Sequence, residues 1–217
     1  MFGQVKPGER ISFDDGCICG VIVAVEPQAL LVEITEARRR GSRLRADQGI
    51  NLPDTALVLP ALTQRDRDRA VLPFVARHTN SVTFSYVQSP ADVEGLHVLL
   101  CQLNRADHGL ILKIETRQAF DDLPAILLSA MASNAPLGVM IARGDLVIEC
   151  GWERLAELQA EILRFCEAAH LPCIWATQVL EELAHHGIRQ RMHGHQHKTR
   201  SLFRRLELAT NHSALAP

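Results

Sequence analysis

A lysine and a carboxylate at the end of one short apolar run have the types and spacing of an active-site pair. The run covers residues 110–115 and closes with Leu112, Lys113, Ile114 and Glu115. Alternate side chains of a β-strand share a face, so Lys113 and Glu115 lie on one face of it. The apolar face suits a covering of helices, which directs the lysine and the glutamate towards an open rim. The same pattern also fits a buried Lys–Glu ion pair or a strand end exposed to solvent.

A second carboxylate follows the next apolar run. Residues 138–142 lead into a triplet that contains Gly144 and Asp145, so the carboxylate falls just past a strand end. Gly144 would let the backbone approach a ligand closely. Glu115 and Asp145 supply two oxygen ligands with room for water and substrate oxygens, which suits Mg²⁺ or Mn²⁺. Lys113 could then stabilise negative charge on a transferring phosphoryl group or an enolate. A turn in which Asp145 caps a helix is the alternative.

Two hydroxyls stand in other apolar runs and carry less weight. Thr177 ends the run 173–177 and can donate a hydrogen bond to a bound oxyanion, with a helix N-cap as an equal alternative. Ser85, in the run 82–87, could face the same rim.

Four apolar runs, each leading into a helix-like segment, must position these groups. They cover residues 82–87, 110–115, 138–142 and 173–177. Their spacing is that of βα units, which predicts parallel strands joined by helical crossovers. The absence of a Gly-x-Gly-x-x-Gly fingerprint favours a barrel over a dinucleotide-binding sheet. Catalytic groups of such barrels lie at the carboxyl ends of the strands, but four units make only half of an eight-stranded barrel.

Two helices have a clear apolar stripe, and a separate β region precedes them. One helix begins near Ser89, and the other covers residues 152–169. Trp152 and Trp175 are expected in the core. Residues 1–52 predict short strands punctuated by turn signals, and therefore a small β-rich domain.

Composition narrows the possible environments and partners. The 217 residues carry a formal net charge of −2, which gives no strong attraction to nucleic acid or to an anionic membrane. No apolar run has the length of a membrane span, and no apolar signal region begins the chain, so we expect a cytoplasmic protein. The six cysteines form no CxxC pair and are expected to be buried free thiols.

The motifs together resemble the pyruvate kinase family over most of the chain. The core motifs are Ile111-Leu112-Lys113-Ile114-Glu115-Thr116, Gly138-Val139-Met140-Ile141-Ala142-Arg143-Gly144-Asp145 and Ala176-Thr177-Gln178. The upstream motifs, in the family's order, are Phe13-Asp14-Asp15-Gly16, Gly49-Ile50-Asn51-Leu52-Pro53 and Leu59-Pro60-Ala61-Leu62-Thr63. The resemblance extends from about Val5 to Ile188.

The resemblance implies a reaction and a role for each residue. The family transfers a phosphoryl group from phosphoenolpyruvate to ADP, giving pyruvate and ATP. Lys113 would match the lysine that stabilises the transition state, and Glu115 and Asp145 would match the ligands of Mg²⁺ or Mn²⁺. The backbone at Gly144 and Asp145, with the catalytic hydroxyl of Thr177, would match the site of the substrate carboxylate.

The resemblance also implies a partial fold: the later part of a β-barrel lid in residues 1–52 and part of a TIM (β/α)8 barrel in residues 53–188. The family's phosphate-gripping arginine and its K⁺ ligands find no match here. We therefore expect impaired or absent activity in this chain alone. Homo-oligomerisation or association with a complementary barrel fragment would be the way to complete a site.

The segment 189–217 loses the family pattern. It holds six basic residues and a single acid, Glu207, and it contains the run His193-Gly194-His195-Gln196-His197. We expect a disordered basic tail, with adventitious binding of Zn²⁺, Ni²⁺ or Cu²⁺ by the histidines as the alternative. A frameshift or a split gene would explain the change, and sequencing of the flanking DNA tests that hypothesis.

Two other functions stay open at this point. The chain could be a non-catalytic remnant of the family, since open barrel edges expose unpaired backbone groups. A more distant alternative is a metal-dependent aldolase or lyase that acts on phosphoenolpyruvate or pyruvate and also holds metal with strand-end carboxylates. The lid-like segments around Phe13 and Asn51 argue against it.

Overall fold

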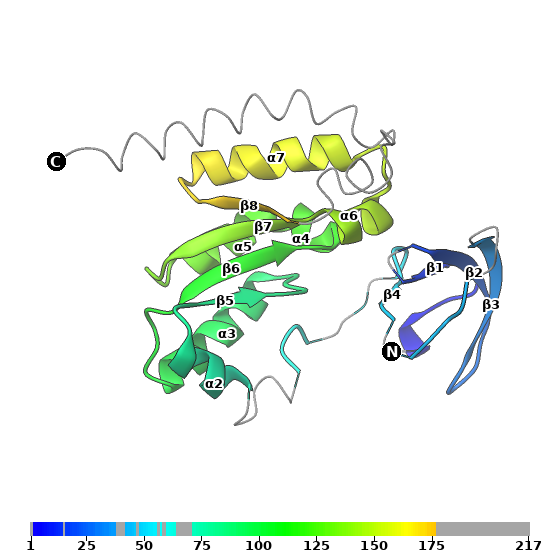
Figure 1. Ribbon diagram of the computed structural model, residues 1–217, viewed down its shortest axis with the longest axis horizontal. Helices are drawn as coiled ribbons and strands as arrows, with labels where there is room; N and C mark the ends of the chain where they lie inside the picture. The colour runs from blue at the N-terminus through cyan, green and yellow to red at the C-terminus, as the bar shows by residue number, and fades with distance from the viewer. Residues whose placement is uncertain are drawn as a thin grey trace.

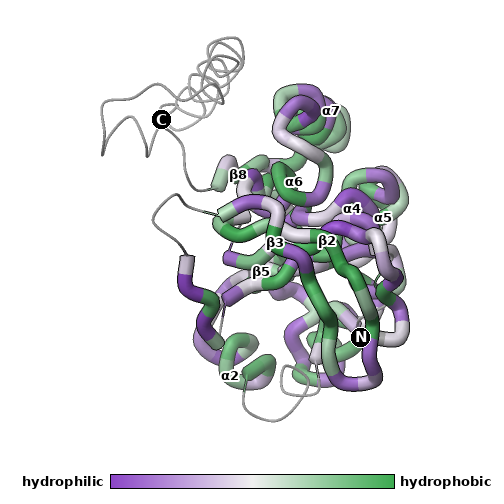
Figure 2. The backbone as a smooth tube through the Cα atoms, turned by 90° about the vertical axis from the view of Figure 1, so that its right-hand side faces the viewer, coloured by the Kyte–Doolittle hydropathy of each residue, from purple (hydrophilic) through white to green (hydrophobic). Residues whose placement is uncertain are grey.

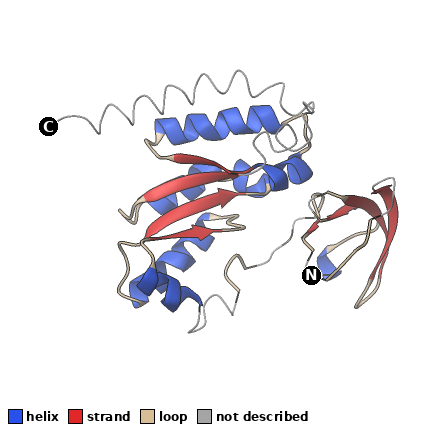
Figure 3. Cartoon of the chain, in the orientation of Figure 1, coloured by secondary structure: helices blue, strands red, loops and turns tan. Residues whose placement is uncertain are grey.

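The computed structural model of this chain describes residues 2–14, 16–37, 42–46, 48–55, 57, 60–63 and 71–176. These residues form two four-stranded sheets, one antiparallel and one parallel. Figure 3 shows α-helices beside the parallel sheet, whereas the antiparallel sheet carries a single short helical turn. The predictions for Thr177 and for residues 189–217 lie outside the described residues.

The antiparallel sheet has the strand order β3-β2-β1-β4. After the 3-10 helix η1 (Phe2–Gln4) come β1 (Arg10–Phe13), β2 (Ile18–Val25), β3 (Leu30–Ala37) and β4 (Ile50–Asn51). The short strands expected in residues 1–52 are confirmed. Figure 2 shows that β2 is mostly hydrophobic, and its buried residues Ile18 and Ile22 pack with Ile11 and Leu52 in a small core.

The parallel sheet has the order β5-β6-β7-β8, which follows the chain without a reversal (Figure 1). Its strands are β5 (Ser81–Phe84), β6 (Gly109–Ile114), β7 (Leu137–Ala142) and β8 (Cys173–Ala176). Ile114 pairs with Ile141, so β6 and β7 end at the same edge. The four apolar runs are thus confirmed as parallel strands.

Helices connect each strand to the next, as the βα spacing predicts. They are α2 (Val71–His78), α3 (Pro90–Gln102), α4 (Arg117–Asp121), α5 (Leu123–Met131), α6 (Arg143–Cys150) and α7 (Leu155–Ala168). Ser89 begins α3 with a capping box: its hydroxyl accepts from the backbone N–H of Asp92, and the Asp92 carboxylate accepts from the backbone of Ser89. No described helix is long and apolar enough to cross a lipid bilayer.

The helices bury one face of the parallel sheet more completely than the other. Leu112, Ile114 and Ile141 are fully buried in one cluster with the helices. Lys113, Met140 and Ile174 form a row across three strands on the opposite face. The side chain of Lys113 is 25% exposed and Ile174 is 40% exposed. This second face is therefore only partly covered among the described residues.

The core positions expected for the tryptophans and the cysteines are confirmed only in part. Trp152 is 54% exposed because Gly151, at φ +87°, ends α6 and leaves the tryptophan in the turn before α7. Trp175 is half-buried in β8. Cys101 is exposed near the end of α3, whereas Cys150 and Cys166 are buried as expected.

Candidate active site

Lys113 and Glu115 point to the same side of β6, as their spacing predicts. Lys113 Nζ lies 2.5 Å from Glu115 Oε1, so they form an ion pair. The glutamate side chain is only 2% exposed, whereas the lysine side chain is 25% exposed. The intervening Ile114 faces the helices and is fully buried. The Lys–Glu ion pair, which the sequence allowed as an alternative, is therefore present. It lies at the end of the strand, where catalytic groups were expected.

The second oxygen of Glu115 is held by the turn after β5. The backbone N–H of Tyr86 donates to Glu115 Oε2 over 2.5 Å. Tyr86 has φ +53°, a left-handed conformation that a bulky aromatic residue rarely adopts. Such strain often accompanies a functional turn. No sequence signal identified Tyr86, because left-handed backbone is predicted mainly at glycine and asparagine. The neighbouring Ser85 is half-buried.

These two contacts explain how a carboxylate is kept in a buried position. An ionised carboxylate withdrawn from water is costly unless a cation or hydrogen-bond donors compensate it. Lys113 supplies the positive charge and Tyr86 supplies an N–H. A buried charge with two dedicated partners is the kind of arrangement that orients a ligand group.

Asp145 lies in the first turn of α6, which starts directly after β7. The triplet therefore forms the first turn of the helix, and Gly144 is a helical residue. Ala142 is the N-cap and makes no side-chain cap, so Asp145 is not the capping residue either. A carboxylate in the first turn is favoured by the positive end of the helix dipole. Because β6 and β7 end together, Glu115 and Asp145 both follow strands that end at the same edge of the sheet.

Arg143 ties the start of α6 to the next strand. It is 2% exposed, and its guanidinium carbon lies 5.2 Å from the centre of the Trp175 ring. Trp175 Nε1–H donates to Gln159 Oε1 over 2.7 Å, and Gln159 Nε2 donates to the Leu155 carbonyl over 2.9 Å. Burial lowers the pKa of Arg143. Sequence reasoning gave Arg143 and Gln159 no role, since their burial depends on tertiary packing.

Arg117 and Glu149 extend the polar contacts towards the antiparallel sheet. Arg117 Nη2 donates to the Glu149 carbonyl over 3.0 Å, from the start of α4 to the last turn of α6. The helix α6 also contacts β4, in which Asn51 is 7% exposed. Burial raises the pKa of Glu149, and the neighbouring Arg117 opposes that rise more than Asn51 does.

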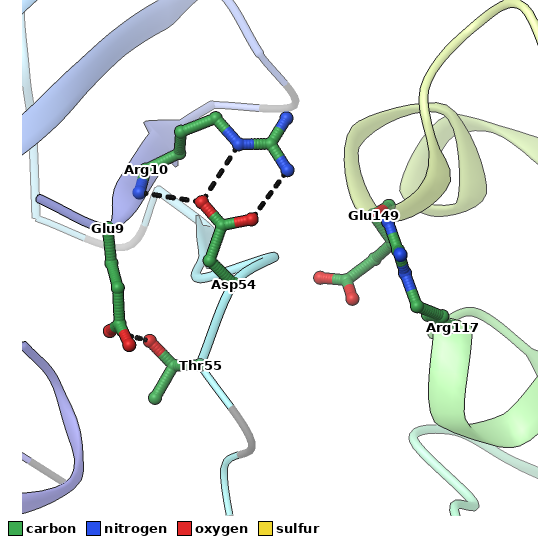
Figure 4. A network of polar contacts seen from close by, with 6 residues as sticks. All are labelled: Glu9, Arg10, Asp54, Thr55, Arg117 and Glu149. Atoms are coloured by element: carbon green, nitrogen blue, oxygen red, sulfur yellow. Dashed lines mark hydrogen bonds and ion pairs between the residues drawn. The ribbon is translucent and has the colours of Figure 1, made fainter.

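In the antiparallel unit, the Arg10 guanidinium donates hydrogen bonds to the Asp54 carboxylate over 2.9 and 2.6 Å. The Arg10 backbone N–H donates a third hydrogen bond to the same carboxylate over 3.0 Å. Figure 4 shows this pair facing Arg117 and Glu149 across a gap. The Asp54 pKa is lowered, chiefly by the hydrogen bonds from Arg10.

A cavity of about 960 Å³ opens between these elements. Its walls include Asn51 and Pro53, the stretch around Pro60 and Ala61, and the α4 residues Arg117 and Asp121. Tyr86 and Thr116 bring it next to the rim that carries Glu115. The cavity therefore adjoins the candidate site.

The described residues supply only part of the ligands that a divalent metal ion needs. No group of three or more His, Cys, Asp or Glu side chains gathers as a metal cage among the described residues. Glu115 and Asp145 are two carboxylates at one edge, and Mg²⁺ is commonly held by one or two carboxylates together with water and substrate phosphate oxygens. The chemistry of these two residues thus fits Mg²⁺ or Mn²⁺.

Consecutive parallel strands with a lysine and carboxylates at one carboxyl edge are typical of metal-assisted α/β enzymes. Comparison with known proteins specifies the class. A family model described as pyruvate kinase, barrel domain, matches residues 1–194. The chain belongs to the pyruvate kinase family, as the resemblance of its motifs indicated. The match ends a little beyond Ile188, where the resemblance was expected to stop.

Curated relatives agree with the family model. The chain is 27% identical over 183 residues to a pyruvate kinase of Clostridium acetobutylicum, covering 84% of this chain and 36% of that protein. It is 30% identical to a pyruvate kinase of Bacillus licheniformis, covering 84% and 30%. It is 33% identical to one of Mycobacterium tuberculosis (strain H37Rv), covering 81% and 35%. The chain thus spans about a third of the length of these relatives.

Proposed function

We propose that this chain carries the lysine and carboxylate half of a pyruvate kinase site. The reaction is the transfer of a phosphoryl group from phosphoenolpyruvate to ADP, which yields pyruvate and ATP in glycolysis. The observation that carries the proposal is the Lys113–Glu115 ion pair, at the edge where α6 also begins with Asp145, in a chain of this family.

Each residue has a defined task in this proposal. Glu115 and Asp145 would hold Mg²⁺ or Mn²⁺, and the metal would supply positive charge to the phosphoryl oxygens. Lys113 stabilises the charge that develops on the transferring phosphoryl group and on the enolate oxygen. The ion pair keeps its ammonium at the rim until substrate arrives. The backbone N–H groups at Gly144 and Asp145, at a helix N-terminus, and the Thr177 hydroxyl bind the substrate carboxylate.

The proposal includes a partial barrel that a second polypeptide completes. The strand order follows the chain, as in (β/α)8 barrels, and the row formed by Lys113, Met140 and Ile174 corresponds to the barrel interior. Among the described residues β5 and β8 are edge strands. A complementary barrel fragment or a second copy would cover this face. Such a partner would also supply the phosphate-gripping arginine and the K⁺ ligands that the family implies.

A coupled assay for pyruvate tests the proposal. Purified chain is incubated with phosphoenolpyruvate, ADP, Mg²⁺ and K⁺, alone and together with a polypeptide that comprises the remaining segments of the Clostridium acetobutylicum relative. We expect pyruvate formation only in the mixture. Lys113→Met should remove it, whereas Lys6→Met, which changes an exposed lysine of the antiparallel unit, should not.

The opposite result has a clear meaning. Folded protein that forms no pyruvate in either arrangement would contradict the proposal. It would favour a non-catalytic remnant of the family, the second candidate, which the half-exposed sheet face with its 40%-exposed Ile174 also suits.

A further inference from the structure

The two proposed metal carboxylates come from separate elements, and their relative position depends on how α6 is held. Glu115 follows β6, whereas Asp145 sits in the first turn of α6. This helix has eight residues and lacks a side-chain N-cap. A helix this short is marginal without tertiary contacts. A contact that fixes the far end of α6 therefore also fixes where Asp145 stands.

Arg117 makes such a contact from the start of α4, which is held by a helix cap. The Thr116 hydroxyl accepts from the Ala119 backbone N–H at 3.1 Å and caps α4, so the backbone next to Glu115 is fixed. Arg117 is the first residue of α4, and its guanidinium donates to the Glu149 carbonyl at 3.0 Å. That carbonyl lies in the last turn of α6, where carbonyls lack helical partners and a cation is favoured.

We propose that Arg117 is a positioning residue for the metal site, because it ties the last turn of α6 to the start of α4, two residues after Glu115. The inference rests on the proposed function and names a residue that touches neither substrate nor metal. The strand β4, which carries Asn51, contacts α6 from the antiparallel unit.

The experiment measures Mn²⁺ binding by the full chain, using electron paramagnetic resonance of free Mn²⁺. The variants are Arg117→Met, Arg117→Lys and Glu115→Gln, with Arg164→Met, an exposed arginine of α7, as the control for lost charge. Loss of a positive charge alone would tighten Mn²⁺ binding by nearby carboxylates. Loss of positioning weakens it, so the two effects have opposite signs.

We expect Arg117→Met to weaken Mn²⁺ binding about three- to tenfold, the range of one charge-assisted hydrogen bond that is partly solvated. Arg117→Lys should recover part of the loss, and Arg164→Met should bind as the parent does. Hydrogen exchange in the metal-free chain provides a second readout. Amides of α6 should exchange faster in Arg117→Met, while those of α7 stay unchanged.

The outcomes separate the two proposals. Mn²⁺ binding that depends on Glu115 but is unchanged or tighter in Arg117→Met, with unchanged exchange in α6, would overturn the positioning role and leave the proposed function standing. A parent chain that binds no Mn²⁺ would overturn the metal site and, with it, the role of Arg117.

Discussion

At the scale of single residues, the site is built around one buried carboxylate. Glu115 is 2% exposed and has two partners, Lys113 and the backbone of Tyr86. The spacing of Lys113 and Glu115 predicted their common face, because strand periodicity is local. The contact with Tyr86 could not be predicted, because it joins the left-handed turn after β5 to the residue that follows β6.

The ion pair makes a prediction about stability. Lys113→Met leaves the buried Glu115 without its cation and should lower the free energy of unfolding by about 1–3 kcal/mol, less than for a fully buried pair because the lysine is 25% exposed. Glu115→Gln should cost less, since the amide oxygen can still accept from Tyr86. Urea unfolding of both single variants and the double variant gives the coupling energy. A coupling near zero would show that the pair contributes nothing to stability.

At the scale of elements, the strands and their connections followed from the sequence, but the form of the β7–α6 junction did not. Short apolar runs at βα spacing identified all four parallel strands. Asp145 was expected just past a strand end and is found there, yet inside a helix that begins at once. The sequence left open a turn in which Asp145 caps a helix, and the packing of Arg143 against Trp175 is a tertiary contact that favours an earlier helix start.

The turn between α3 and β6 gives a pH dependence. His108 is 1% exposed, and its pKa is lowered, mainly by burial and then by the charge of Arg105. The unfolded chain therefore binds a proton at higher pH than the folded chain does, so stability falls as pH drops below about 6.5. Chemical unfolding between about pH 8 and pH 5 should show this loss. His108→Gln should reduce the slope, and an unchanged slope would contradict the assignment.

At the scale of the whole molecule, the described residues form two hydrophobic cores. The chain passes from one core to the other near Pro60. Leu52 and Leu57 pack with the antiparallel sheet, and Ala61 and Leu62 pack with the parallel one. The division between residues 52 and 53 stays a prediction, as do barrel closure and the lid. Closure depends on partners of the edge strands, which periodicity within one segment cannot specify.

The half-covered face of the parallel sheet predicts self-association. Among the described residues β8 is an edge strand, and its Ile174 is 40% exposed, so Ile174→Lys should reduce association by placing a charge on an edge. Val98→Lys is a matched control, since Val98 is 53% exposed on α3. Light scattering over a range of protein concentrations measures the effect. Equal behaviour of the two variants would contradict a role for this face.

The most direct test of the central claim is a Mn²⁺ titration of the parent chain, Glu115→Gln, Asp145→Asn and the exposed control Glu33→Gln. If Glu115 and Asp145 form the metal half of a pyruvate kinase site, the parent and Glu33→Gln bind one Mn²⁺ ion, and each of the other two variants loses it while staying folded by circular dichroism. Equal Mn²⁺ binding by all four proteins, or by none, would contradict the claim.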